Sequence, residues 1–259
     1  MRNISALFFK EIRIYFTTPV AYVALTVFTI VSSFFFLRFL SDFQHRIMIA
    51  TQMRPEILQY LNFTDQVLQP LFYNTAVILV FVLPFVTMRL IAEERRAKTF
   101  ELLLTNPITP FQIAAGKFLA ALVVVLAMVL LVGIYPLLVW AYATLGAPAW
   151  GTVFTGLLGL FLAGAAFTAI GLFVSSLTNS QTVAAAITFC TLLLLWVVGW
   201  AASDNSGLTR EFLNGMSAIE HIRGFAKGVI DLKDVVYYLS LVFLGLFLTR
   251  RTLEAQRWR

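Results

Sequence analysis

Long runs of apolar residues, separated by short polar segments, dominate the pattern along this chain. Five stretches contain no Asp, Glu, Lys or Arg, namely 14–37, 66–88, 118–177, 179–203 and 235–249. A helix needs roughly 20 apolar residues to cross a bilayer core of about 30 Å. The third stretch holds two such segments and divides at the turn-like sequence Leu145-Gly146-Ala147-Pro148. We therefore expect six membrane-spanning helices, near 18–40, 66–88, 112–144, 151–176, 180–202 and 232–250.

The composition favours one polytopic, all-α membrane domain over residues 1–259. Hydrophobic residues make up 60% and charged residues 12% of the chain, whereas soluble domains average about 45–50% and about 25%. A chain with so little charge is neither a soluble enzyme nor a disordered protein. Cys190 is the single cysteine, so the sequence predicts no intrachain disulfide and no cysteine-based metal site.

The few charges are unevenly distributed between the two sides that these helices define. With the N-terminus placed inside, the inner segments carry a net charge of +7 and the outer segments −1, out of a total of +6. Basic residues gather on the cytoplasmic side of such proteins. We expect both termini in the cytoplasm, with random scatter of charge as the alternative. The positive total is thus a sign of topology, and no nucleic-acid partner is predicted.

The first 17 residues form an amphipathic segment. Ile4, Leu7, Phe8, Ile12 and Tyr15 share one helical face, and Arg2, Lys10, Glu11 and Arg13 lie on the other. This pattern is typical of a helix that lies in the membrane interface. Thr18-Pro19 is expected to serve as N-cap and first residue of the next helix. The alternative is one continuous helix with a kink at Pro19.

The segment 89–109 joins the second and third predicted spans and is the most densely charged part of the chain. Glu94 and Lys98 stand at i,i+4 in the favourable order for a helical ion pair. Asn106-Pro107 is expected to end this helix. Thr109-Pro110-Phe111-Gln112 has the form of a capping box with proline at the first helical position. A new, long helix should begin there and project from the membrane. Taken alone, the charged segment is also compatible with an ordinary solvated loop helix.

Within this segment, Glu93-Glu94-Arg95, Thr99-Phe100-Glu101-Leu102-Leu103 and Pro107-Ile108 resemble the cytoplasmic loop of ABC-2-type permeases, the membrane subunits of ATP-binding-cassette transporters. Members usually show E-x-R-x-x-x-T-x-E-x-L-L-x-x-P, often with Gly before the Thr, where this chain has Lys98. The order of elements along the whole chain is similar too. Residues 222–231 resemble the outer segment of the gliding-motility and copper-maturation permease subfamily.

The resemblance implies an ABC-2 permease fold of the type V exporter kind, in which this loop docks into a cleft of a separate ATPase subunit. Two ATPase copies, which bind ATP and Mg²⁺, and a second permease copy, identical or related, would complete the assembly. The charged residues would pair across a polar interface, and the apolar ones would anchor it. The implied coupling residues are Glu94, Arg95, Arg96, Lys98, Thr99, Glu101, Leu102, Leu103 and Pro107.

The chain itself offers no catalytic, cofactor-binding or metal-binding residues. It has no G-x-x-x-x-G-K-[ST] sequence and therefore no P-loop. The predicted spans lack the Asp, Glu or His relays that proton-coupled carriers use. His45 and His221 both fall in outer segments. We expect His221 to be a solvated helix residue.

The outer segment 204–231 repeats apolar residues at steps of three and four. Ser217-Ala218-Ile219-Glu220 has the form of a capping box, which predicts two short amphipathic helices with a break between them. One interpretation is an outer gate formed by Phe212, Met216, Ile222 and Phe225. The other is packing against the membrane surface.

These observations lead to the hypothesis of an export permease in a bacterial or archaeal cytoplasmic (inner) membrane. An ATPase partner would supply the energy, and a periplasmic accessory protein is a further candidate partner. Two alternatives stay open. One is an ATP-driven mechanotransmission or assembly complex that acts on an extracytoplasmic partner without transport. The other is a channel or carrier that works without an ATPase.

Overall fold

The structure is a computed structural model that describes residues 2–53, 56, 61–99, 108–142, 148–203 and 207–257. Throughout these ranges the ordered elements are helical. In chain order they are α1 (Arg2–Thr17), α2 (Pro19–Met53), the short π-helix η2 (Thr64–Leu68), α3 (Gln69–Thr87), α4 (Ala92–Arg96), α6 (Pro110–Tyr142), α7 (Trp150–Leu177), α8 (Gln181–Ser203), α9 (Leu208–Met216), α10 (Glu220–Ala226) and α11 (Leu232–Arg257).

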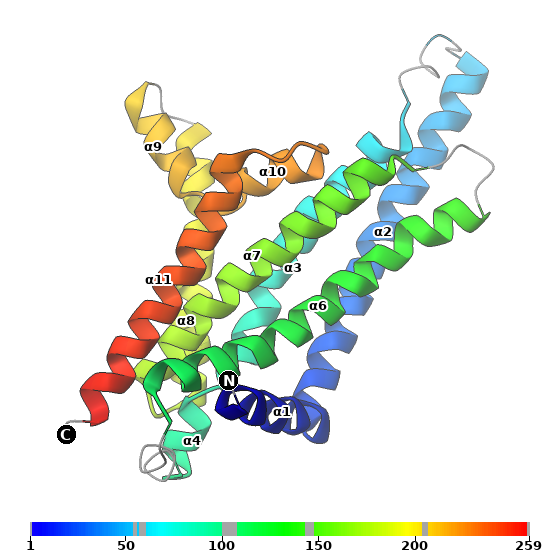
Figure 1. Cartoon of the computed structure of the whole chain (residues 1–259). Coiled ribbons are helices and arrows are strands. Elements are labelled where there is room, and N and C mark those ends of the chain that lie inside the picture. The colour runs from blue at the N-terminus through cyan, green and yellow to red at the C-terminus, as the bar shows by residue number, and fades with distance from the viewer. Residues whose placement is uncertain are drawn as a thin grey trace.

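Six helical segments are long and apolar enough to cross a membrane. They are Pro19–Gln52, Thr64–Arg96, Pro110–Tyr142, Trp150–Leu177, Gln181–Ala201 and Leu232–Gln256. The prediction of an all-α, six-span membrane protein is therefore confirmed. The long helices run side by side, with α1, α4 and both chain ends at one end of the bundle and α9 and α10 at the other (Figure 1). We call these the α1 end and the α10 end.

The first spanning helix is longer than the expected 18–40. α2 continues to Met53, which at 1.5 Å per residue makes it about 52 Å long. No proline or glycine interrupts the sequence after Pro19 until Pro55, so the hydrogen-bond ladder has no reason to stop where the charges begin. Phe43 and Ala50 are buried beyond the predicted end, and Arg38 pairs with Asp42 at 3.5 Å.

The N-terminal helix lies across the α1 end of the bundle (Figure 1). It stops at Thr17 and α2 starts at Pro19, so the chain turns at Thr18. The expected role of Thr18 as an N-cap is wrong, because its hydroxyl donates backwards to the carbonyl of Ile14 at 2.9 Å. Glu11 was placed on the polar face, but it is buried together with Leu7 and Tyr15. These three residues form the stripe that packs onto the bundle.

Helix α7 lies at the centre of the packing. It contacts α3, α6, α8, α10 and α11, and small side chains allow the close approach of its neighbours. At Gly245 of α11 the neighbour is backbone: an added Cβ would stand 2.7 Å from the carbonyl oxygen of Ala169. A backbone atom cannot move aside, so this position requires glycine. Helices α7 and α11 therefore pack with their backbones in close contact.

Candidate functional site

The charged segment after α3 is fastened to the end of α7 by one hydroxyl. Ser175 Oγ accepts hydrogen bonds from the backbone N–H groups of Ile91 and Ala92, both at 3.1 Å. The same hydroxyl donates to the carbonyl of Met88 at 3.0 Å. One buried side chain thus satisfies three backbone groups of the turn that leads into α4. The start of α4 is therefore fixed relative to α7.

Helix α4 is shorter than the predicted loop helix and ends in a left-handed residue. Lys98 has a φ of 55°. Its N–H donates to the carbonyl of Arg95 at 3.1 Å, and the N–H of Thr99 donates to the carbonyl of Glu94 at 3.0 Å. These are the two hydrogen bonds of a Schellman motif, in which the left-handed position favours glycine. The Gly that relatives often carry before the Thr would suit this conformation.

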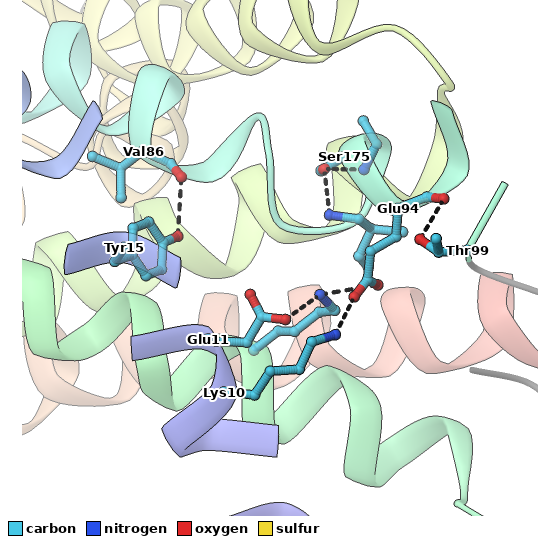
Figure 2. Close-up of polar contacts among 10 residues, drawn as sticks. Lys10, Glu11, Tyr15, Val86, Glu94, Thr99 and Ser175 are labelled. Atoms are coloured by element: carbon cyan, nitrogen blue, oxygen red, sulfur yellow. Dashed lines mark hydrogen bonds and ion pairs between the residues drawn. The ribbon is translucent and has the colours of Figure 1, made fainter. Parts of the chain in front are cut away.

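The expected ion pair between Glu94 and Lys98 is therefore wrong, because Lys98 has already left the helix. Glu94 instead turns toward α1 and α6 (Figure 2). Its Oε1 lies 3.1 Å from Nζ of Lys10, and its Oε2 lies 3.0 Å from Nζ of Lys117. Lys117 also donates to Glu11 Oε1 at 2.7 Å. We call these four residues, Lys10, Glu11, Glu94 and Lys117, the charge cluster.

The charge cluster is largely removed from water. The side chains of Lys117, Glu11 and Glu94 are 1%, 7% and 14% exposed, whereas that of Lys10 is 50% exposed. Two lysines and two glutamates balance in charge, which an ionic group in a poorly solvated place requires. The angle of the contact between Lys117 and Glu94 leaves Glu94 Oε2 without a hydrogen bond. The cluster connects α1, α4 and α6, which are distant in sequence.

Tyr15 adds a second polar link between α1 and the bundle. Its hydroxyl donates to the carbonyl of Val86 near the end of α3 at 3.0 Å (Figure 2). Burial, together with the nearby carboxylate of Glu11, raises the pKa of Tyr15 well above the usual value for a phenol. The hydroxyl therefore stays protonated and remains a donor. α1 is held to α3 by Tyr15 and to α4 and α6 by the charge cluster.

Helix α6 begins with the predicted capping box. The N–H of Gln112 donates to Thr109 Oγ1 at 3.3 Å, and the N–H of Thr109 donates to Gln112 Oε1 at 3.1 Å. Pro110 occupies the first helical position. The helix has 33 residues, or about 50 Å at 1.5 Å per residue. Lys117 lies two turns from its start, so the charge cluster contacts one end of a long helix.

The structure divides the predicted coupling residues into two groups. Glu94 is held in the charge cluster, while Arg95 is half-buried and Arg96, Lys98 and Thr99 are exposed. Thr99 also donates through its hydroxyl to the carbonyl of Glu94 at 3.3 Å. The other predicted coupling residues, Glu101, Leu102, Leu103 and Pro107, lie outside the described residues.

Sequence reasoning missed Lys10, Glu11, Lys117 and Ser175 as parts of this site. Two signals were present. Glu11 stands four residues from both Leu7 and Tyr15, so it shares the apolar face of α1. Lys117 is an isolated charge directly before a long apolar run. Neither signal identifies a partner, because the pairing joins residues about a hundred positions apart.

The four predicted gate residues at the α10 end do not share one environment. Ile222 and Phe225 are buried on α10. Phe225 packs closely on α7, because a Cβ added at Gly159 would lie 2.5 Å from the Cβ of Phe225. Phe212 and Met216 are exposed on α9. The break between α9 and α10 falls at Ser217, whose hydroxyl accepts from the N–H of Glu220 at 3.4 Å.

The expectation that His221 is solvated is wrong. Its side chain is 12% exposed, and Nδ1 lies 2.7 Å from Oδ1 of the buried Asp234 on α11. Nε2 lies 3.2 Å from the carbonyl of Gly215 on α9, and the ring stacks on Tyr237 with centroids 4.0 Å apart. His221 thus joins α9, α10 and α11. Sequence spacing did not reveal this, because Asp234 lies beyond the turn that separates α10 from α11.

The chain was compared with known proteins. A family model described as "ABC-2 family transporter protein" matches residues 6–225, which include most of α1, the charge cluster and nearly all of α10. No curated protein matches the chain. The match covers most of the sequence and agrees with the six apolar helices and with the motif in the segment after α3. The chain therefore belongs to the ABC-2 family of transporter proteins.

Proposed function

We propose that this chain is the permease subunit of an ABC transporter and that it couples ATP hydrolysis in a separate ATPase subunit to export of a substrate. Membership of the ABC-2 family supports the role of membrane subunit. In this proposal ATP and Mg²⁺ bind to two ATPase copies, and a second permease copy completes the complex. The ATPase acts on the segment that contains α4.

The observation that carries the proposal is the position of Glu94. Its carboxylate lies within 3.1 Å of Lys10 on α1 and within 3.0 Å of Lys117 on α6. Ser175 fixes the start of α4 to α7. A force on α4 would therefore reach three helices through short, largely buried contacts. Packed elements of this kind move as units and do not deform continuously.

The exposed part of the segment indicates what the ATPase surface must provide. The carboxylate of Glu94 already pairs with Lys10 and Lys117. Arg96 and Lys98, in contrast, are exposed at the α1 end. We infer that these cations meet acidic side chains of the ATPase, which would steer and orient docking. The part of the motif that lies outside the described residues is proposed to complete the contact, namely Glu101, Leu102, Leu103 and Pro107.

The same proposal assigns a location and a subfamily. The α1 end faces the cytoplasm of a bacterial or archaeal cell, because the inner segments hold the positive charge. Residues 222–231 favour the gliding-motility and copper-maturation subfamily on sequence likeness alone. A periplasmic accessory protein is a proposed partner at the α10 end.

Docking is tested by co-purification. The chain is expressed together with a candidate ABC ATPase from the same cell, either unchanged or as the double variant Arg96→Glu/Lys98→Glu. We expect the double variant to lose most of the bound ATPase, because two favourable contacts become repulsive. The matched control is Arg210→Glu on α9, an exposed cation at the far end, which should retain the ATPase. Equal recovery of the ATPase with all three chains would refute docking at α4.

Coupling is tested separately with Glu94→Gln. This change keeps the size of the side chain and weakens both contacts to lysine, while Arg96 and Lys98 stay in place. We expect the ATPase to co-purify as before. Its activity in nanodiscs should no longer respond to the permease, and transport into inverted vesicles should fall. Normal transport by Glu94→Gln would show that force does not pass through this carboxylate.

A further inference from the structure

A pocket of about 380 Å³ with charged residues on its walls opens at the α10 end, far from the charge cluster. One wall comes from η2 and the start of α3, with Asp65, Gln69, Tyr73 and Asn74. The other wall comes from α10 and the residue that follows it, with Arg223 and Lys227. The guanidinium of Arg223 lies 5.6 Å from the centre of the Tyr73 ring. The pocket is therefore bounded by two elements that tertiary contacts bring together.

The charges around the pocket are segregated by wall. Arg223 and Lys227 stand four residues apart, so both cations project from the same side of α10. Asp65 supplies the negative charge on the opposite wall, where its Oδ1 accepts from Gln69 Nε2 at 2.6 Å. Glu220 pairs with Arg223 at 3.0 Å and offsets part of the cationic wall. Two cations and two carboxylates give a local net charge of zero.

We propose that this pocket binds a zwitterionic headgroup that carries a phosphate and a primary ammonium. The phosphate would lie against Arg223 and Lys227, because guanidinium and ammonium groups both bind phosphate oxygens well. The ammonium would lie toward Asp65, whose second carboxylate oxygen can accept a hydrogen bond from it. A plain anion fits less well, since Asp65 and Glu220 would repel it.

The depth of the pocket suits a lipid headgroup. Gln69 is the first residue of α3, and Tyr73 and Asn74 lie one turn inside it. The pocket thus lies where the apolar segment Thr64–Arg96 begins, and we infer that it is at the level of the headgroup region rather than the hydrocarbon. The same chemistry occurs in phosphatidylethanolamine and in soluble phosphoethanolamine esters, so the test must distinguish a membrane source from a soluble one. The proposal is independent of ATPase coupling.

The test is a binding titration on the purified full chain in detergent micelles. The probes are phosphatidylethanolamine with a fluorophore on one acyl chain and phosphatidylglycerol with the same label. We expect the ethanolamine lipid to bind about fivefold more tightly than the glycerol lipid, because only the former places a cation at Asp65. Glycerophosphoethanolamine, which has no acyl chains, is added as competitor. Displacement at similar concentrations assigns the site to a soluble ligand, and failure to displace assigns it to a lipid.

Three variants are expected to change the affinities for the two lipids in different ways. Asp65→Asn should weaken binding of the ethanolamine lipid about threefold and strengthen binding of the glycerol lipid, because only the negative charge of Asp65 is lost. Lys227→Gln should weaken the binding of both lipids. Lys233→Gln, an exposed cation at the same end that does not line the pocket, should change neither. Tighter binding of phosphatidylglycerol to the unchanged chain, or affinities for both lipids that Asp65→Asn leaves unchanged, would overturn the proposal.

Discussion

Lys117 Nζ donates to Glu11 Oε1 across 2.7 Å, and both side chains are almost completely buried. This contact joins the N-terminal helix α1 to the long helix α6. The two ions sit where water cannot solvate them, so each depends on the other. The pair holds α1 against α6 at the α1 end, and it leads to the first prediction.

Removing the cation alone should strongly destabilise the fold. We expect Lys117→Met to lower the free energy of unfolding by about 3–5 kcal/mol, since it strands the buried carboxylate of Glu11 and removes one partner of Glu94. The double variant Glu11→Met/Lys117→Met should recover part of the loss. Denaturant unfolding in detergent measures both. Lys10→Met is the control. Because Lys10 is half-exposed, this change should lower the free energy of unfolding by about 1 kcal/mol or less. Similar losses for Lys10→Met and Lys117→Met would contradict this account.

The left-handed backbone at Lys98 predicts a stabilising substitution. A residue with a Cβ pays a steric cost at a φ of 55° that glycine does not. We expect Lys98→Gly to stabilise the end of α4 by about 0.5–1 kcal/mol. Hydrogen exchange at the amide of Thr99, which closes the motif, should slow accordingly.

The control for this prediction has the opposite sign. Arg96→Gly changes the last helical residue before the cap and should speed exchange at Thr99, because glycine costs about 1 kcal/mol within a helix. Faster exchange in Lys98→Gly would show that the left-handed residue does not limit the stability of this helix end.

The contact of Gly245 with Ala169 predicts a position that tolerates no side chain. Gly245→Ala should destabilise the packing of α11 on α7 by about 1–3 kcal/mol, because the new methyl would meet a backbone carbonyl. Gly151→Ala is a matched control within α7, where an added Cβ meets nothing within 4 Å. That variant should be neutral or slightly stabilising. Thermal unfolding of the two single variants decides the matter, and equal midpoints would be inconsistent with the packing described above.

The buried pair at the α10 end gives the fourth prediction. His221→Ala should lower stability by about 3 kcal/mol, because it leaves the carboxylate of Asp234 buried without its partner. His45 is exposed on α2, so His45→Ala should remain within about 0.5 kcal/mol of the unchanged chain. Limited proteolysis between α9 and α10 should also accelerate only in the first variant. Unaltered proteolysis after His221→Ala would mean that this ring does not hold the two helices together.

Local features were predictable wherever neighbouring residues decide the outcome. The capping box of Thr109 and Gln112 forms as expected, and the break at Ser217 separates α9 from α10. The predicted ion pair between Glu94 and Lys98 was wrong, because i,i+4 spacing brings two side chains together only within a helix, and α4 ends at Arg96. Local reasoning failed for Thr18 as well, whose hydroxyl caps the preceding helix rather than the following one.

The sequence by itself determined that this is an all-α membrane protein with six spans, since burial of apolar runs in a bilayer depends on length and composition. It also determined the family, through a motif that is contiguous along the chain. Only the tertiary structure decided that Glu94 pairs with Lys10 and Lys117, that Glu11 is buried and that His221 meets Asp234. Those partners come from different helices. A buried charge is stable only where the packing of those helices brings its counter-ion within reach, and that packing is a property of the whole fold.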